Sequence, residues 1–425
     1  MNRVGLTRRD VLRIAGIGSA SLIVGCGDNE RPRDAGNSHA AFVVEPDESS
    51  FIVVVWSSEA RTVALEVQSG DAIVMSTVME ISEIGSFDVT GLAASTNYQV
   101  HLVFDTGVEL GPHHVRTAPL ADDPRPVRIA VSADVDPNLE FDSELLAHCA
   151  AASPEVFVSI GDFPYADNGP DVAVTVDAYR NRYAQTVTAP RQRAWLQAMA
   201  VRAIYDDHEF RNDFDGMYRV AEASRYAAAM QVWDEFFPVR GAAGEIRYRA
   251  FRWGAHVDCI MLDCRRFRSA NAAPDDANKT MLGDTQRAWL IDTLESSTAT
   301  FKLVFTSVPL DFADGNDHWA AYTYERSLIF DALVGIPGIL FVSADQHWFA
   351  AHKHAHGIRE FQVGPVCRGI GTPHVFAPGV LFRSMQYNFA LIDVDGEQLT
   401  FSGVGPDGVT FYKETLTPQA LTPQP

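Results

Sequence analysis

The stretch Val156-Phe-Val-Ser-Ile-Gly-Asp162 is a short, mostly apolar run that stops on an aspartate. The same pattern occurs in four more places, at Val127–Asp134, Val201–Asp207, Val257–Asp263 and Ile339–Asp345. Short β-branched runs separated by helical stretches are typical of buried strands in an α/β sheet. Ligands of such sheets bind beyond the carboxyl ends of the strands. The sequence therefore predicts an α/β fold whose functional site lies at that edge, beside the aspartates.

These aspartates would repel one another wherever the fold gathers them. Two ionised carboxylates about 5 Å apart repel by roughly 3 kcal/mol at an effective dielectric constant near 20. Such a group must hold either protons or cations. We expect metal ions.

The composition is that of an acidic chain with ample apolar residues for a core. Of 425 residues, 47% are hydrophobic, and 34 basic against 55 acidic side chains give a formal net charge of −21. This charge argues against binding to nucleic-acid phosphates and fits an acidic exported protein. Beyond residue 30 the sequence has no apolar stretch long enough for a membrane span.

Residues 1–25 have the features of a targeting segment. The twin arginine of Leu6-Thr-Arg8-Arg9 precedes the apolar stretch Ile14–Val24, which predicts export by the twin-arginine route. The alternative is a chance arginine pair in an ordinary secretory signal. Ile23-Val24-Gly25-Cys26 resembles a lipoprotein processing site, so the chain is expected to be periplasmic or at the cell surface, either anchored by acylation of this cysteine or simply cleaved and released. Residues 26–38 are polar and predict a linker.

Residues 39–118 form the next predicted domain. Short alternating strands separated by turn residues predict a small all-β sandwich there. Asp88-Val-Thr-Gly-Leu92, followed by Tyr98, resembles the element of fibronectin type III domains in which a leucine and a tyrosine pin a strand corner. Trp56 is expected to be the core tryptophan of this sandwich. The chemistry is expected in the larger α/β domain, residues 122–416.

Two blocks of the α/β part carry residue types that bind metals. Gly161-Asp162-Phe-Pro-Tyr165 places a tyrosine three residues after a strand-terminal aspartate, and a phenol ionises near neutral pH only beside a partner such as a metal ion. A packed tyrosine in a turn is the structural alternative. Asp345-Gln-His347 has i, i+2 spacing, so both side chains should project to one face of a strand.

A third block, Asp206-Asp207-His208-Glu209, follows the third of the strands. A charged helix cap is the alternative interpretation. Asn212 comes one helical turn after His208, so it is expected to point into the same site.

The order of these blocks resembles that of PhoD-type alkaline phosphatases, which are metallophosphatases with a fibronectin-like N-terminal domain. The resemblance extends to Leu262-Asp-Cys-Arg265-Arg-Phe-Arg268 and to Met281-Leu-Gly-Asp-Thr-Gln286-Arg-Ala-Trp289-Leu, and covers essentially the whole mature chain. It implies an α/β metallophosphatase-type αββα sandwich preceded by a fibronectin III-like sandwich. It also implies a hydrolase of phosphomonoesters or phosphodiesters, with phospholipase D activity in some members, and Fe³⁺ with Ca²⁺ as cofactors.

The resemblance implies a role for each block. Asp162 would bridge two metal ions, and Tyr165 and His347 would bind the first, trivalent one. The second ion would take Asp207 and Asp345, and Asn212 is added as a metal ligand from its spacing after His208. His208 would approach the leaving group.

One position departs from the family pattern. The family has Ser-Cys in its first block, with the thiolate on iron, whereas here Ser132 is followed by Ala133, which cannot bind a metal. We therefore assign the first-metal role to Asp134; Asp136 is explained equally well as a turn residue. A hard carboxylate in place of a thiolate shifts the preference toward hard ions. Fe³⁺ remains expected because of Tyr165, and the second ion is expected to be Ca²⁺, Mn²⁺ or Zn²⁺.

Arg265 is the predicted clamp for the phosphate substrate, because a guanidinium binds phosphate oxygens in a bidentate fashion. A surface salt bridge is the alternative. The predicted reaction is attack of a metal-activated water on a phosphate ester, with His208 or Arg265 stabilising the leaving group. Two other functions stay open: a phospholipase D-like phosphodiesterase acting on lipids, and a surface binding protein with weakened catalysis.

Overall fold

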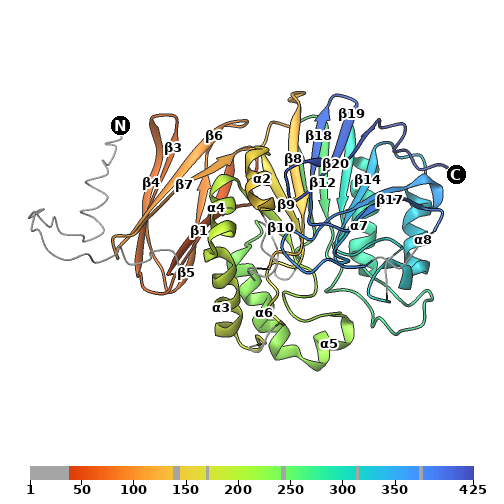
Figure 1. Ribbon diagram of the computed structural model, residues 1–425, viewed down its shortest axis with the longest axis horizontal. Helices are drawn as coiled ribbons and strands as arrows, with labels where there is room; N and C mark the ends of the chain where they lie inside the picture. Colours follow the sequence, from red (N-terminus) through yellow and green to blue (C-terminus); the bar gives the residue numbers. More distant parts are fainter. Residues whose placement is uncertain (1–37, 137–143, 169–171, 241–245, 313–314, 373–376) are drawn as a thin grey trace, which may run out of the picture.

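The protein forms three β-sheets with helices packed on the outside (Figure 1). The computed structural model describes residues 38–136, 144–168, 172–240, 246–312, 315–372 and 377–425. The predicted targeting segment, its processing cysteine and all but the last residue of the predicted linker lie outside these ranges. No helix among the described residues is long and apolar enough to cross a membrane.

The largest sheet has nine strands in the order β20-β19-β18-β8-β9-β10-β1-β2-β5. Its central strands β8, β9 and β10 are parallel neighbours, as expected for buried strands joined by helices. The strands are β1 (His39–Val44), β2 (Ser50–Ser57), β5 (Ile84–Thr90), β8 (Val127–Ser132), β9 (Val156–Ile160), β10 (Val201–Ile204), β18 (Phe389–Asp395), β19 (Gln398–Val404) and β20 (Thr410–Leu416).

A second sheet of seven strands, in the order β11-β12-β13-β14-β16-β15-β17, packs against the first. Its strands β12, β13, β14 and β16 run parallel. The strands are β11 (Arg249–Trp253), β12 (Val257–Met261), β13 (Phe301–Phe305), β14 (Ile339–Ser343), β15 (Phe349–Lys353), β16 (Arg359–Gln362) and β17 (Val380–Ser384).

The two sheets form the inner layers of an αββα sandwich, as the sequence predicted. In β12, Cys259 and Met261 join the core shared with the first sheet, whereas Ile260 packs with Leu290 and Leu294 of a covering helix. This alternation follows from the two-residue period of a strand. The helices on the first sheet are α2 (Leu145–Ala151), α3 (Val176–Thr188), α4 (Pro190–Ala198) and α6 (Ala223–Phe236), and those on the second are α7 (Gly283–Ser296) and α8 (Thr323–Ala332). The short helix α5 (Gly216–Ala221) packs against α6.

The N-terminal sandwich shares a sheet with the rest of the protein. Its outer sheet has the order β4-β3-β6-β7 and faces β1, β2 and β5 of the nine-stranded sheet. Its strands are β3 (Thr62–Ser69), β4 (Ala72–Glu80), β6 (Asn97–Phe104) and β7 (Glu109–Arg116). The predicted strand corner forms, because the hydroxyl of Tyr98 accepts a hydrogen bond from the N–H of Ala93 (2.9 Å).

Trp56 does not lie in the core of this sandwich, contrary to the prediction. In β2, Phe51, Val53 and Val55 fill the sandwich, while Trp56 points to the opposite face and joins the main core. Both faces of β2 are buried. Its hydrophobic pattern therefore does not reveal which face belongs to which core.

A buried ion-pair network connects the sandwich to the α/β body. Glu45 directly follows β1, and its carboxylate accepts hydrogen bonds from Arg202 of β10 (2.9 Å) and Arg249 of β11 (3.1 Å). Burial favours the protonated acid, but the two guanidinium groups outweigh it and lower the pKa of Glu45. Glu45 and Arg202 each follow directly after the residue at which β1 and β10 pair in parallel, Val44 with Val201.

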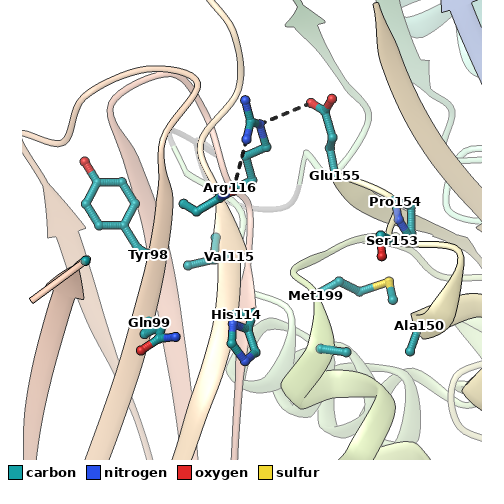
Figure 2. A pocket seen from close by; sticks show the side chains of 13 residues that line it. Tyr98, Gln99, His114, Val115, Arg116, Ala150, Ser153, Pro154, Glu155 and Met199 are labelled. Atoms are coloured by element: carbon teal, nitrogen blue, oxygen red, sulfur yellow. Dashed lines mark hydrogen bonds and ion pairs between the residues drawn. The ribbon is translucent and has the colours of Figure 1, made fainter.

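A hollow of about 580 Å³ lies between the sandwich and the α/β body (Figure 2). It is lined by residues of β6 and β7 on one side and of α2 and α4 on the other. Arg116 of β7 and Glu155 point toward each other across it, with 3.8 Å between their charged atoms. None of the predicted site residues lines this hollow.

We expect Glu45→Gln to lower the free energy of unfolding by about 3–5 kcal/mol, because the buried Arg202 and the partly buried Arg249 lose their carboxylate partner. Urea denaturation measures the change, and Glu48→Gln at an exposed neighbour should stay within about 0.5 kcal/mol of wild type. A carboxyl with a lowered folded pKa stabilises the protein above its unfolded pKa and loses this effect as the pH falls. The difference between wild type and variant should therefore shrink below about pH 4; a difference that is independent of pH would contradict the assignment.

Candidate active site

The carboxyl ends of β8, β9, β10 and β14 converge on one group of acidic side chains. β8, β9 and β14 end two residues before Asp134, Asp162 and Asp345, and β10 ends three residues before Asp207. Because β8, β9 and β10 are parallel neighbours, their ends meet at one edge of the nine-stranded sheet. β14 supplies its aspartate from the facing sheet. The site therefore lies where both sheets end.

The residues of this group adopt an unusual backbone conformation. Positive φ angles are uncommon outside glycine and cluster at functional sites. Residues with positive φ here are Asp134 (62°), Asp162 (57°), Asp345 (73°) and His347 (60°). For the three aspartates this left-handed conformation comes two residues after the end of a strand, where the chain leaves the sheet.

The first cluster consists of Asp134, Asp162 and His347, whose potential ligand atoms all lie within 4.8 Å of one another. The Tyr165 hydroxyl joins them, donating to Asp134 at 3.3 Å and lying 2.9 Å from Nε2 of His347. The other ring nitrogen of His347 contacts the carbonyl of Gly369 (2.7 Å), which fixes the ring.

Asp162 and Asp207 link this cluster to further ones. Asp162, Asp207 and His208 form a second group within 4.8 Å, and Asp206, Asp207 and Asp345 form a third. Asp162 therefore belongs to two adjacent groups, which is the arrangement that a bridging carboxylate requires.

Arg265 is not placed to clamp a substrate, and this part of the prediction is wrong. Its side chain is 0% exposed, and its guanidinium pairs with Asp206 (2.6 Å) and Asp317. It also lies 3.6 Å from both Asp207 and Asp345. Arg265 is thus an internal counter-ion of the acidic group, because carboxylates surround its buried guanidinium and leave no surface for a substrate.

The fifth strand-terminal aspartate, Asp263, stays outside these clusters and positions Arg265. Its carboxylate accepts hydrogen bonds from the backbone N–H groups of Arg265 (3.1 Å) and Arg266 (2.9 Å) and from the Tyr205 hydroxyl (2.7 Å). These bonds hold the turn that aims Arg265 into the acidic group.

His208 lies beside Tyr165 and belongs to the group of Asp162 and Asp207. Its Nδ1 is 2.7 Å from Asp167, and its ring lies 4.3 Å from that of Tyr165. Burial disfavours its charged form, but Asp207 and the bond to Asp167 outweigh burial and raise the pKa of His208 to about 9. A protonated His208 carries positive charge next to the carboxylates.

The helix expected after His208 does not continue beyond a single turn, in which the N–H of Arg211 donates to the carbonyl of Asp207 (2.6 Å). Residues 208–210 make a turn, and Asn212 is exposed, with its backbone N–H donating to Asp167 (2.6 Å). The placement of Asn212 therefore does not support a ligand role. Asp345 and His347 do not lie on one face of a strand, as their spacing predicted, but belong to different clusters. The chain bends there, and both residues have left-handed backbone conformations.

Several site residues were not among the predicted ones. Asp206 and Asp317 pair with Arg265, and Asp167 holds His208. Asp206 adjoins a predicted ligand in sequence, so the doubled aspartate was the available signal. Asp317 and Asp167 lie in loops, and their spacing along the chain gives no indication of the contact.

The acidic group is suited to metal ions because some of its buried oxygens lack hydrogen-bond partners. In the described part of the chain, Oδ2 of Asp134, Oδ2 of Asp162 and Oδ1 of Asp207 are buried and have no hydrogen-bond partner. Leaving buried polar atoms unpaired is costly unless a cation satisfies them. A contrasting case is the His352–His354–Glu360 group, where the carboxylate of Glu360 accepts from both rings and from the Leu310 N–H, and so is satisfied by the protein itself.

The protonation equilibria lead to the same conclusion. Burial and the charge of Asp206 raise the pKa of Asp134 to about 8, and burial with Asp207 raises that of Asp162. Burial also lowers the pKa of His347 to about 4, so its ring is neutral and able to donate a lone pair. The carboxylates must bind protons or cations, and the neutral imidazole among them favours cations.

Gly364 makes room for Asp134. Its φ is +89°, and a Cβ atom there would lie 2.2 Å from Oδ2 of Asp134. The N–H of Gly364 donates to Asn388 (3.0 Å), which fixes the loop that carries it. A side chain at this position would displace one of the unpaired oxygens.

Comparison with known proteins identifies the family. The model of the PhoD-like phosphatase family matches residues 141–381, more than half of the chain. The chain belongs to the PhoD-like phosphatase family. Alkaline phosphatase D of Bacillus subtilis (strain 168) is 27% identical over 209 residues, a match that covers 41% of this chain and 35%, about a third, of that protein.

Solved structures of low sequence identity share the fold of this PhoD-like protein. A structure of PhoD superposes with a TM-score of 0.79 at 17% identity and covers 93% of this chain and 92% of its own. The purple acid phosphatase PPD1 from yellow lupin (Lupinus luteus) seeds gives a TM-score of 0.64 at 11% identity, covering 90% of this chain and 75% of that one. The predicted family resemblance and metallophosphatase-type fold are confirmed.

We expect Gly364→Ala to lower the metal content of the purified protein, because the added methyl group competes with Asp134 for space. Gly107→Ala is the matched control: its φ is +84° and a Cβ there meets nothing within 4 Å, so it carries the same backbone strain away from the site. Elemental analysis of both variants after metal loading is the measurement. Equal metal contents in the two variants would show that Gly364 does not shape the site.

Proposed function

We propose that this protein is a metal-dependent phosphoesterase with its active centre at the ends of β8, β9, β10 and β14. The observation that carries this proposal is the set of buried carboxylate oxygens of Asp134, Asp162 and Asp207 that have no hydrogen-bond partner among the described residues. Membership of the PhoD-like phosphatase family supports a phosphate ester as the substrate. The net charge of −21 disfavours the approach of a phosphate anion, and bound cations would offset this repulsion at the site.

The donor set suggests how two ions would be held. Asp134, Tyr165 and His347 would hold the first, and Asp207 with Asp345 the second, with Asp162 shared between them. Two bound ions would supply Lewis acidity toward the ester and lower the pKa of an attacking water. Tyr165 would require an ion to ionise, because burial raises the pKa of its hydroxyl.

The protein's own residues contribute orientation and charge. His208, held by Asp167, lies beside Tyr165 and can donate a proton toward a leaving alkoxide. Arg265 holds Asp206, Asp207 and Asp345 together by offsetting part of their charge. Hard oxygen donors and the phenol favour Fe³⁺ for the first ion and Ca²⁺, Mn²⁺ or Zn²⁺ for the second.

The proposal includes the organisation of the whole chain. Residues 39–118 are proposed as a fibronectin III-like domain without chemistry of its own, and residues 122–416 as the catalytic domain. The twin arginine supports export of the folded protein, with Cys26 as a candidate lipid anchor. Turnover of a nitrophenyl phosphomonoester, its bis-ester and phosphatidylcholine identifies the ester class; cleavage of the lipid alone would make the protein a phospholipase.

Asp162→Asn should abolish hydrolysis, with a loss of at least about 10³-fold in kcat, and should lower the bound metal. The amide keeps the size of the side chain but removes the charge that two ions would share. Steady-state rates with the phosphomonoester and elemental analysis are the measurements. Near-normal turnover would remove Asp162 from the centre.

Tyr165→Phe should erase any visible absorption band that arises from a phenolate bound to iron. The substitution removes only the hydroxyl, so the ring should keep its contact with His208. Absorption spectra and iron analysis of wild type and variant give the comparison. An iron-containing wild type whose band survives in the variant would exclude Tyr165 as the ligand.

A further inference from the structure

Glu209 is a buried acidic residue beside the active site that the proposed chemistry does not use. It is 1% exposed and belongs to none of the groups of potential metal ligands found among the described residues. In the sequence it comes two residues after Asp207. Burying a carboxylate is unfavourable unless hydrogen bonds satisfy its oxygens. The groups that donate to Glu209 therefore indicate its role.

The two oxygens of Glu209 bind two different segments of the site. Oε1 accepts a hydrogen bond from the N–H of Phe163 (2.8 Å), the residue directly after Asp162. Oε2 accepts one from the N–H of Asp206 (3.0 Å), the residue directly before Asp207. One carboxylate thus joins the turn after β9 to the segment that follows β10.

These two segments approach each other closely. A Cβ atom at Gly161 would lie 2.5 Å from the Cβ of Asp206, so a residue with a side chain could not take this position without moving the two segments apart. The separation of Asp162 and Asp207 therefore depends on how tightly the two backbones are held together. Glu209 bonds to both of them.

We infer that Glu209 is a positioning residue: by bonding to both segments it sets the separation of Asp162 and Asp207, and so the affinity for the metal ion that both carboxylates would hold. The inference rests on the proposed metal-dependent function. Side chains that hydrogen-bond behind metal ligands orient those ligands, and their removal typically costs about 10–100-fold in metal affinity or activity.

A purely structural role for Glu209 is the alternative, because buried N–H groups need acceptors in any part of a protein. Glu325 of α8 provides a matched control. It is also 1% exposed, and its carboxylate accepts hydrogen bonds from the backbone N–H groups of Met281 and Leu282. In the described part of the chain it belongs to none of the potential ligand groups. Glu325→Gln therefore alters the same kind of contact outside the acidic clusters.

The experiment compares the full-length wild type with Glu209→Gln, Glu209→Asp and Glu325→Gln. The glutamine keeps the size of the side chain but has a single acceptor oxygen for two N–H groups. The aspartate keeps the charge but is one methylene shorter, so its carboxylate should not reach both segments. The measurements are Mn²⁺ bound per chain in equilibrium dialysis, the urea midpoint of unfolding, and kcat and KM for nitrophenyl phosphate.

We expect both Glu209 variants to raise the Kd of at least one bound Mn²⁺ ion about 10-fold or more and to lower kcat by a similar factor. KM should change less than kcat, because the contacts to the substrate remain. Glu209→Gln and Glu325→Gln should both lower the urea midpoint, since each leaves a buried N–H group without its acceptor. Glu325→Gln should keep the Mn²⁺ affinity and kcat of wild type.

Two results would overturn the inference. One is a Mn²⁺ affinity and a kcat of Glu209→Gln that equal those of wild type, and the other is an equal loss of both in Glu325→Gln. If Glu209→Gln does not fold, Glu209→Asp decides by the same criteria. A wild type that binds Mn²⁺ but hydrolyses no phosphate ester would refute the proposed function instead, and the dialysis would still decide the role of Glu209.

Discussion

The structure depends on holding several buried carboxylates side by side at the meeting point of two sheets. Arg265 offsets part of their repulsion through its pairs with Asp206 and Asp317 and its proximity to Asp207 and Asp345. Among the described residues, Oδ2 of Asp134 and Oδ2 of Asp162 have no hydrogen-bond partner, and the Tyr165 hydroxyl and His347 lie beside Asp134. Arg265 therefore offsets only part of the negative charge, and bound cations are proposed to offset the rest.

The backbone is adapted to this arrangement at the strand ends. Left-handed residues turn the chain sharply after β8, β9 and β14, at a cost of about 1–3 kcal/mol each. Glycines permit the close approaches that result: a Cβ at Gly161 would lie 2.5 Å from the Cβ of Asp206, and one at Gly364 would meet Asp134. Packing of the sheets on both sides supplies the stability that maintains these conformations.

The N-terminal sandwich is part of the same framework. β1 continues the nine-stranded sheet next to β10, the strand that precedes Asp207, and Glu45 ties the two strands together through Arg202. β1 thus covers the edge of β10, which would otherwise present unpaired backbone groups. The sandwich lines one wall of the hollow in Figure 2 and contributes none of the acidic clusters.

By itself, the sequence determined the strands, the aspartates that end them and the family resemblance, because strand periodicity and short motifs are local properties. Only the tertiary structure decided which core each strand face joins and which charged side chains lie together. Arg265 follows an apolar segment close to candidate ligands, yet packing encloses its side chain among Asp206 and Asp317. The position of Asn212 was predicted wrongly because spacing along the chain gives the direction of a side chain only while the backbone stays regular. That of Trp56 was predicted wrongly because both faces of its strand are buried, so no polar face shows which way a side chain points.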